Sequence, residues 1–158
     1  TASQDIWFED GNIILVCESI GFRVYKGILS SHSEVFWDML SVGSPSADDS
    51  FDGCALVHLS DSAGDALHFL KTLYDWSYHF PLSTIAGILR MATKYLVYSL
   101  RRAMVDELKE ILPSTLASFK KSSGGRSMIP DFNGVLALNL ATECGIPIIL
   151  PAACYYCS

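Results

Sequence analysis

The sequence predicts an α+β fold, in which a small, mainly antiparallel sheet is flanked by a cluster of helices. Short apolar or alternating runs occur in the first sixty residues, and apolar residues recur at helical spacing through most of the rest. The chain has 158 residues, of which 50% are hydrophobic and 18% charged. This composition excludes an intrinsically disordered chain and is sufficient for a hydrophobic core.

Three segments are predicted to be strands. Residues 12–18 form a β-branched and apolar run, and residues 22–26 alternate apolar with polar side chains. We expect these two segments to pair as an antiparallel hairpin near the N-terminus. A third strand is expected at residues 55–59, after a loop over residues 41–53 that is rich in Ser, Asp and Gly.

The other segments are predicted to be helices. Residues 27–40 are expected to form two short helices, because the triplet Ser31-His32-Ser33 has the composition of a helix cap. Later helices are expected around residues 66–74, 85–95, 100–111, 135–141 and 149–156. Ser62 and Asp131 are the predicted N-caps of the helices that follow them.

Residues 120–130 are rich in Gly, Ser and Lys, which is typical of a flexible linker. We therefore expect a domain over residues 1–112 and a C-terminal helical extension over residues 113–158. The sequence begins at Thr1 without a secretory signal, so we expect it to be part of a longer chain.

Charge and cysteine content limit the function classes. The net charge of −6 lacks the basic surplus that binding to nucleic acid requires, so no nucleic-acid partner is expected. The longest uncharged stretch, residues 144–158, contains two prolines and is shorter than the ~20 residues of a spanning helix, so no membrane segment is expected. Five scattered cysteines, an odd number, predict a reducing intracellular compartment, either cytoplasm or nucleus.

A series of motifs runs from residue 6 to residue 112. It comprises Asp10, residues 22–26 (FRVYK), 33–39 (SEVFWDM), 57–59 (VHL) and 69–74 (FLKTLY), followed by Ile88, Leu89, Ala92, Tyr95 and Leu100. In this order the motifs resemble the BTB/POZ domain, in particular its fungal branch. The resemblance implies a non-enzymatic module for protein–protein interaction, without a cofactor and usually homodimeric.

The resemblance also implies two kinds of site. Several family dimers have a groove lined by a buried acid and base, and Asp10 and Lys26 are the matching positions, although both also fit ordinary surface charges. Members that bind a cullin scaffold carry a hydrophobic-x-Glu signature in the loop at residues 41–53. That loop contains no Glu here, and Phe51 and Asp52 are the nearest approach. A substrate adaptor of a cullin-based ubiquitin ligase is therefore kept as an alternative.

Ile6, Trp7 and Phe8 are three large apolar residues in succession. Alternate side chains of a strand point to opposite faces, so at least one of the three is expected to be exposed or covered by another chain. We interpret this segment as part of a dimer or partner interface, where Trp and Phe concentrate binding energy. Packing beneath the C-terminal helices is the alternative.

Cys154 and Cys157 have the spacing of half a zinc site or of a redox pair. A structural zinc needs four ligands, and the sequence offers neither a second such pair nor paired histidines, so we expect no metal and no cofactor. A small metal- or thiol-dependent protein that uses Cys154 and Cys157 is the alternative from a different class. No nucleophile motif or phosphate-binding loop is present, and no enzyme activity is expected.

Overall fold

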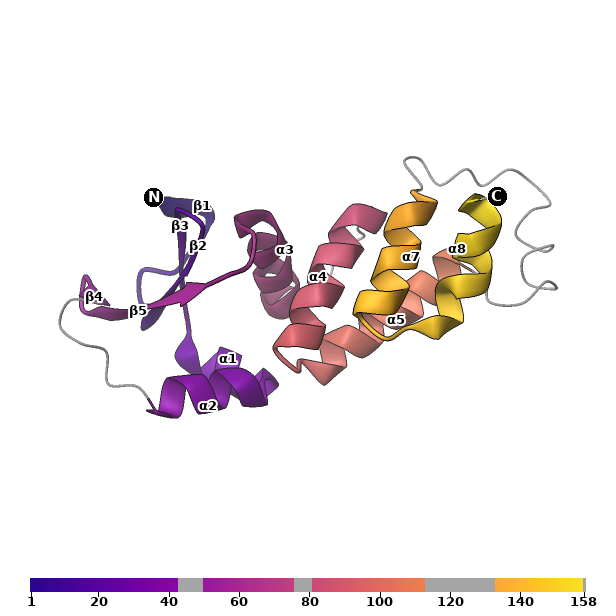
Figure 1. Ribbon diagram of the computed structural model, residues 1–158. Coiled ribbons are helices and arrows are strands. Elements are labelled where there is room, and N and C mark those ends of the chain that lie inside the picture. Colours follow the sequence, from indigo (N-terminus) through magenta and orange to yellow (C-terminus); the bar gives the residue numbers. More distant parts are fainter. Residues whose placement is uncertain (43–49, 76–80, 113–132, 158) are drawn as a thin grey trace.

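A five-stranded sheet forms one end of the molecule and helices form the rest, within the part of the computed structural model that is described, residues 1–42, 50–75, 81–112 and 133–157 (Figure 1). The strands are β1 (Ala2–Trp7), β2 (Ile13–Cys17), β3 (Ile20–Val24), β4 (Ser50–Phe51) and β5 (Cys54–Leu59). The helices are α1 (Lys26–His32), α2 (Glu34–Val42), α3 (Ala63–Tyr74), α4 (Leu82–Lys94), α5 (Tyr98–Ile111), α7 (Gly134–Glu143), the 3-10 turn η2 (Pro147–Ile149) and α8 (Leu150–Cys157). The predicted α+β class is confirmed.

The strand order is β1-β3-β2-β5-β4. The predicted hairpin is confirmed, with β2 and β3 antiparallel from the pair Ile13–Val24 to the pair Cys17–Ile20. Among the described strands, β4 is also antiparallel to its neighbour, whereas β5 is parallel to β2 and β1 is parallel to β3. The sheet is therefore mixed and not mainly antiparallel, because β5 returns beside β2 through the long connection that contains α1 and α2.

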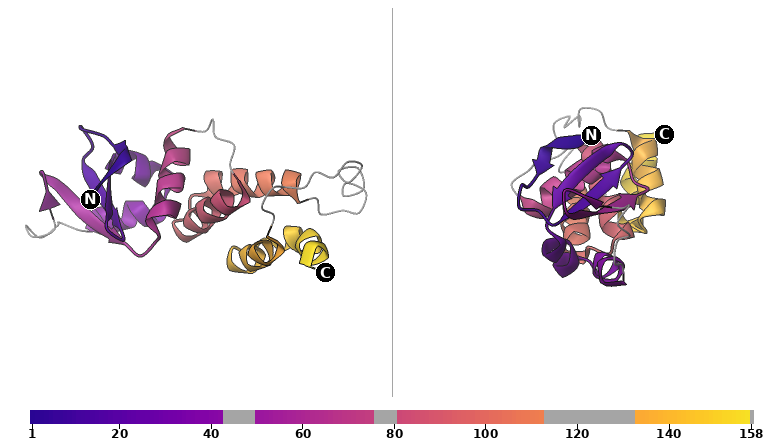
Figure 2. Two further views of the ribbon diagram at one scale, coloured as in Figure 1. Left: turned by 90° about the horizontal axis from the view of Figure 1, so that it is seen from above. Right: turned by 90° about the vertical axis from the view of Figure 1, so that its left-hand side faces the viewer.

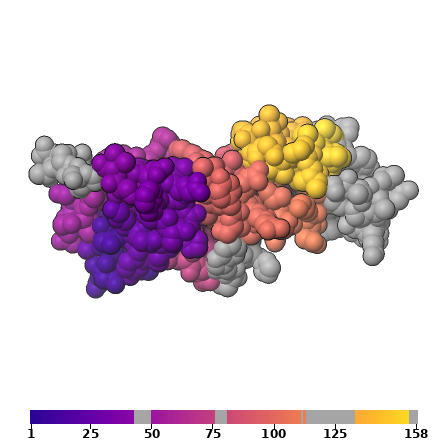
Figure 3. Space-filling model, turned by 90° about the horizontal axis from the view of Figure 1, so that it is seen from below, coloured from indigo at the N-terminus to yellow at the C-terminus, as the bar shows by residue number. Residues whose placement is uncertain are grey.

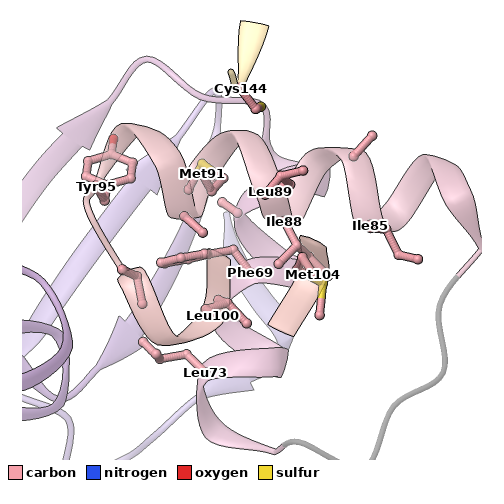
Figure 4. Packing of buried hydrophobic residues seen from close by; sticks show 14 of the residues in the cluster. Phe69, Leu73, Ile85, Ile88, Leu89, Met91, Tyr95, Leu100, Met104 and Cys144 are labelled. Atoms are coloured by element: carbon pink, nitrogen blue, oxygen red, sulfur yellow. The ribbon is translucent and has the colours of Figure 1, made fainter. Parts of the chain in front are cut away.

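One face of the sheet packs on the helices. Side chains alternate along each strand, and Ile13, Leu15 and Cys17 of β2 point into the core together with Phe22 of β3. The helices supply the other half of this core, in which Phe69 is fully buried between α3 and α4 (Figure 4). Figures 1 and 2 show α3 next to the sheet and the later helices in succession away from it.

Ser33 separates α1 from α2, as the sequence predicts. Its hydroxyl accepts a hydrogen bond from the backbone N–H of Phe36 at 3.0 Å and donates one to the carbonyl oxygen of Tyr95. Phe36 is fully buried and its ring stacks on that of Tyr95, with the centroids 4.5 Å apart. The interruption between the two helices therefore fixes them to the C-terminal end of α4.

The C-terminal helices pack against α4 and α5 (Figure 3). Arg90 of α4 forms an ion pair with Glu143 of α7 at 2.7 Å, and Arg101 of α5 donates to the carbonyl oxygen of Cys144 at 2.9 Å. The N-cap of α7 is Asn133, whose side chain accepts from the backbone of Leu136. The predicted cap Asp131 and the predicted linker at 120–130 lie outside the described residues.

No helix in the described ranges is both long and apolar enough to span a bilayer.

Tyr95 joins the end of α4 to the loop before α3. Its hydroxyl donates to Asp61 at 2.6 Å, and Lys94 donates to the same carboxylate at 2.8 Å.

Tyr95→Phe removes one hydrogen bond and leaves Asp61 paired with Lys94. We expect the free energy of unfolding to fall by about 1 kcal/mol in urea titrations. Tyr98→Phe is the matched control, because Tyr98 is 61% exposed and should change stability little. An equal loss in both variants would contradict the role of this hydrogen bond.

Candidate protein-interaction surface

The second face of the sheet is not covered by a helix in the described part of the chain (Figures 1 and 2). Residues that alternate with the core residues form a shallow groove on this face, with a volume of about 460 Å³. Its apolar lining comes from all five strands and consists of Ala2, Trp7, Ile14, Val16, Gly21, Phe51 and Leu56, with Thr1 and Ser19 beside them. We call this feature the open-face groove.

The floor of the open-face groove depends on Gly21. A Cβ atom at this position would lie 3.3 Å from Cγ2 of Ile14 and 3.7 Å from Cζ3 of Trp7. Glycine at this position therefore avoids a tight contact with Ile14, and the indole of Trp7 lies within van der Waals reach of β3. Ile14 is almost completely buried beneath this layer, although it points away from the helices. A buried isoleucine on the outer face gives the groove an apolar floor.

The rim of the groove is formed by the β4–β5 hairpin. Its turn residues Asp52 and Gly53 both have positive φ, 51° and 75°, as a two-residue hairpin turn requires. Phe51 precedes the turn and is 58% exposed. Asp52 forms an ion pair with Arg23 at 2.9 Å, which ties the hairpin to β3. The Asp-Gly pair is the sequence signal from which β4 could have been predicted.

The structure separates the three residues of the predicted N-terminal interface. Ile6 is in the core, with 5% of its surface exposed. Phe8 packs against the rings of Tyr25 and Tyr74, with both pairs of centroids 5.0 Å apart. Trp7 points to the opposite face and lines the groove from β1, whereas Phe51 lines it from β4 at the other edge of the sheet. Trp7 and Phe51, which come from two separate segments of the sequence, therefore line the same groove.

Asp10 and Lys26 are both exposed and have different partners. The hydroxyl of Tyr25 donates to Asp10 at 2.5 Å, and Lys26 donates to the carbonyl oxygen of Leu40 at 2.7 Å. The hydrogen bond to Asp10 raises the pKa of Tyr25 above its ordinary value. The structure of this single chain thus does not bring Asp10 and Lys26 together as a buried acid–base pair.

Helix α2 carries a second group of exposed apolar side chains that the sequence analysis did not propose as a site. Phe36 and Leu40 point into the core, whereas Trp37, Met39 and Val42 are 58%, 36% and 88% exposed. We call these three residues the α2 patch. Helix α2 lies at one end of the sheet and does not cover the open-face groove (Figures 1 and 2).

The possible metal or thiol site receives no structural support among the residues described. Cys154 is exposed on α8, and the side chain of Cys157 lies outside the described part. No group of three or more metal-ligating side chains occurs within the described ranges.

The fold and this surface define the class of protein. One face of the small sheet packs on the helical cluster, and the other face carries the apolar groove. The model of the BTB/POZ domain family matches residues 8–112, and the chain belongs to this family.

The solved structures that are similar to the chain include two BTB domains. The BTB domain of human gigaxonin aligns with a TM-score of 0.50 and 17% sequence identity, over 60% of this chain and 75% of that one. The BTB domain of zebrafish PATZ1 aligns with a TM-score of 0.49 and 19% identity, over 63% and 75% of the two chains. None of the curated proteins compared with the chain matches it. At this identity the first structure supports the fold alone.

Proposed function

We propose that this protein is a non-enzymatic module for protein–protein association, which forms homo- or hetero-oligomers. The observation that carries the proposal is the open-face groove, an apolar hollow built from all five strands and bordered by the exposed ring of Phe51. Interfaces concentrate their binding energy in aromatic anchors such as Trp and Phe, which pack into apolar hollows of this kind. Membership of the BTB/POZ family supports the same function.

No specific contact among the described residues favours a role as a cullin adaptor. The predicted nearest match to the cullin signature, Phe51 and Asp52, lies in the β4–β5 hairpin, where Asp52 is paired with Arg23. Most of the loop in which that signature is expected, residues 43–49, lies outside the described part. We keep the general association function and propose no cullin partner.

We also propose an intracellular location. In the described part of the chain, Cys17, Cys54 and Cys144 are free thiols. All three are buried, where a thiol packs as a small apolar group. Free thiols persist in the reducing compartments of the cell, which supports this location.

The association function can be tested by measuring both kinds of partner. The purified chain is examined by light scattering, and the immobilised chain is used to capture proteins from an extract of its native cells. We expect either self-association or specific retention of another protein, with loss of that binding in Phe51→Asp or Trp37→Asp. A monomer that retains no protein would contradict the proposed function.

A further inference from the structure

We infer that the bond between Asp52 and Gly53 is a site of spontaneous covalent modification, at which aspartate isomerises to isoaspartate, and that Arg23 slows this reaction. The glycine nitrogen attacks Cγ of the aspartic acid and forms a C–N bond, while the nitrogen proton and the side-chain hydroxyl leave as water. Water then opens the resulting succinimide ring at the main-chain carbonyl, so that the chain continues through Cγ. The reaction needs no enzyme, and the inference does not depend on the proposed association function.

The sequence contains two Asp-Gly pairs, Asp10-Gly11 and Asp52-Gly53. A glycine after the aspartate favours ring closure, because no side chain hinders its nitrogen and its backbone is free to rotate. In an unfolded chain the two pairs should therefore react at similar rates. Any difference between them in the folded protein reports how the structure holds each pair.

The pair Asp10-Gly11 is held tightly. Gly11 is buried, and its N–H donates to the carbonyl oxygen of Phe8 at 2.9 Å. A Cβ atom on Gly11 would lie only 2.9 Å from Cγ of Arg23. The carboxylate of Asp10 accepts a hydrogen bond from the hydroxyl of Tyr25 at 2.5 Å. Both reacting groups are thus fixed, so ring closure at this pair requires more extensive unfolding.

The pair Asp52-Gly53 forms the exposed turn of the β4–β5 hairpin. In the described part of the chain, no neighbouring atom lies within 4 Å of the place where a Cβ atom of Gly53 would be. The side chain of Asp52 is 67% exposed. Strand β4 has only two residues and lies at the edge of the sheet, so a local opening of the turn costs little free energy. Such an opening lets the glycine nitrogen reach the carboxyl group.

Arg23 opposes the reaction at this turn. Its guanidinium is paired with the carboxylate of Asp52 at 2.9 Å, and its side chain is only 13% exposed. Its Nε also donates to the carbonyl oxygen of Gly11 at 2.9 Å, which fixes the guanidinium in place. The ring closes through the uncharged carboxylic acid, whereas the guanidinium stabilises the ionised form. The ion pair therefore lowers the population of Asp52 that can react.

The modification changes the hairpin without changing the mass of the protein. Isoaspartate adds one carbon atom to the main chain inside a two-residue turn, whose geometry depends on two ordinary residues with positive φ. Phe51, which precedes the turn, lines the open-face groove. Isomerisation of Asp52 therefore alters the rim of this groove.

The test is peptide mapping of the parent protein after incubation at neutral pH, both folded and in urea. Tryptic peptides are analysed by electron-transfer fragmentation, which locates isoaspartate at individual residues. In urea we expect similar rates at Asp52 and Asp10. In the folded protein we expect the rate at Asp52 to exceed that at Asp10 by about tenfold or more. Deamidation at Asn133, which also precedes a glycine, changes the peptide mass and is counted separately.

The role of Arg23 is tested with Arg23→Gln, which removes the cation and keeps a long side chain. We expect the rate at Asp52 to rise about threefold, as fits the loss of a modest ion pair. Lys71→Gln is the matched control, because it removes a pair of similar length, 2.8 Å, with Asp5. It should leave the rate at Asp52 unchanged, and circular dichroism should show both variants folded. In the parent, about 1 M sodium chloride screens the pair and should also raise the rate.

Three outcomes would overturn the inference. Equal rates at Asp52 and Asp10 in the folded protein, or isoaspartate at Asp52 only in urea, would refute the site. A rate at Asp52 that responds neither to Arg23→Gln nor to salt would refute the restraint by Arg23. An equal rise in Arg23→Gln and Lys71→Gln would show a general loss of stability and would refute it as well. None of these measurements involves a binding partner, so they are independent of the association function.

Discussion

Phe69→Ala is expected to lower the free energy of unfolding by about 3–5 kcal/mol, because it removes a fully buried ring and leaves a cavity. Phe69 lies on α3 at the contact with α4, and its ring centroid is 6.4 Å from that of Tyr95 (Figure 4). The loss is a large fraction of the roughly 5–15 kcal/mol that stabilises a typical domain. Urea unfolding followed by circular dichroism measures it directly.

Phe51→Ala is the control for this substitution. It also removes a phenyl ring, but from a side chain that is 58% exposed in the single chain. The free energy of unfolding should therefore change by no more than about 0.5 kcal/mol at low protein concentration. A loss below about 1 kcal/mol in Phe69→Ala would mean that the contact between α3 and α4 is not a rigid part of the core.

Single strands and helices could be predicted because the patterns that indicate them lie within a few neighbouring residues. The alternation in residues 22–26 and the helical spacing of Ile85, Ile88 and Leu89 follow directly from the geometry of one strand or one helix. Ser62 accepts from the backbone of Asp65, as predicted for the start of α3. Such predictions require no knowledge of distant residues.

The strand pairings were not predictable in the same way. The strand β1 has no alternating pattern of its own, and it forms because Gly21 and Arg23 of β3 offer a free edge beside it. The parallel pairing of β5 with β2 joins residues about forty positions apart, so no short-range pattern indicates it. The β4–β5 hairpin is the exception, since the Asp52-Gly53 turn was visible in the sequence.

The candidate site illustrates the same limit. The expectation that Ile6, Trp7 and Phe8 could not all enter one core is confirmed, because Trp7 points to the open face and Ile6 to the core. The sequence could not show that Trp7 and Phe51 line the same groove, since this depends on the order of all five strands. The sequence also could not show that the hydroxyl of Tyr25 donates a hydrogen bond to Asp10, because this depends on the positions of both side chains.

Cys17 gives the protein a specific weakness at alkaline pH. The thiol is fully buried on β2, and this burial, with a smaller effect of the nearby Asp61 and Glu18 carboxylates, raises its pKa from 9.0 to about 11. Between these two values the unfolded chain loses the thiol proton while the folded chain keeps it. The unfolded state therefore binds fewer protons, and the free energy of unfolding falls as the pH rises.

We expect Cys17 to account for a loss of about 3 kcal/mol between about pH 9 and pH 11, at 1.36 kcal/mol for each unit of pKa shift. The measurement is urea unfolding at a series of pH values under reducing conditions, for the parent and for Cys17→Ala. The variant loses some stability at every pH through the smaller side chain, but its decline across this range should be less steep by the stated amount. Tyrosine ionisation contributes to both proteins and cancels in the comparison. Parallel pH profiles would show that the buried thiol does not control alkaline stability.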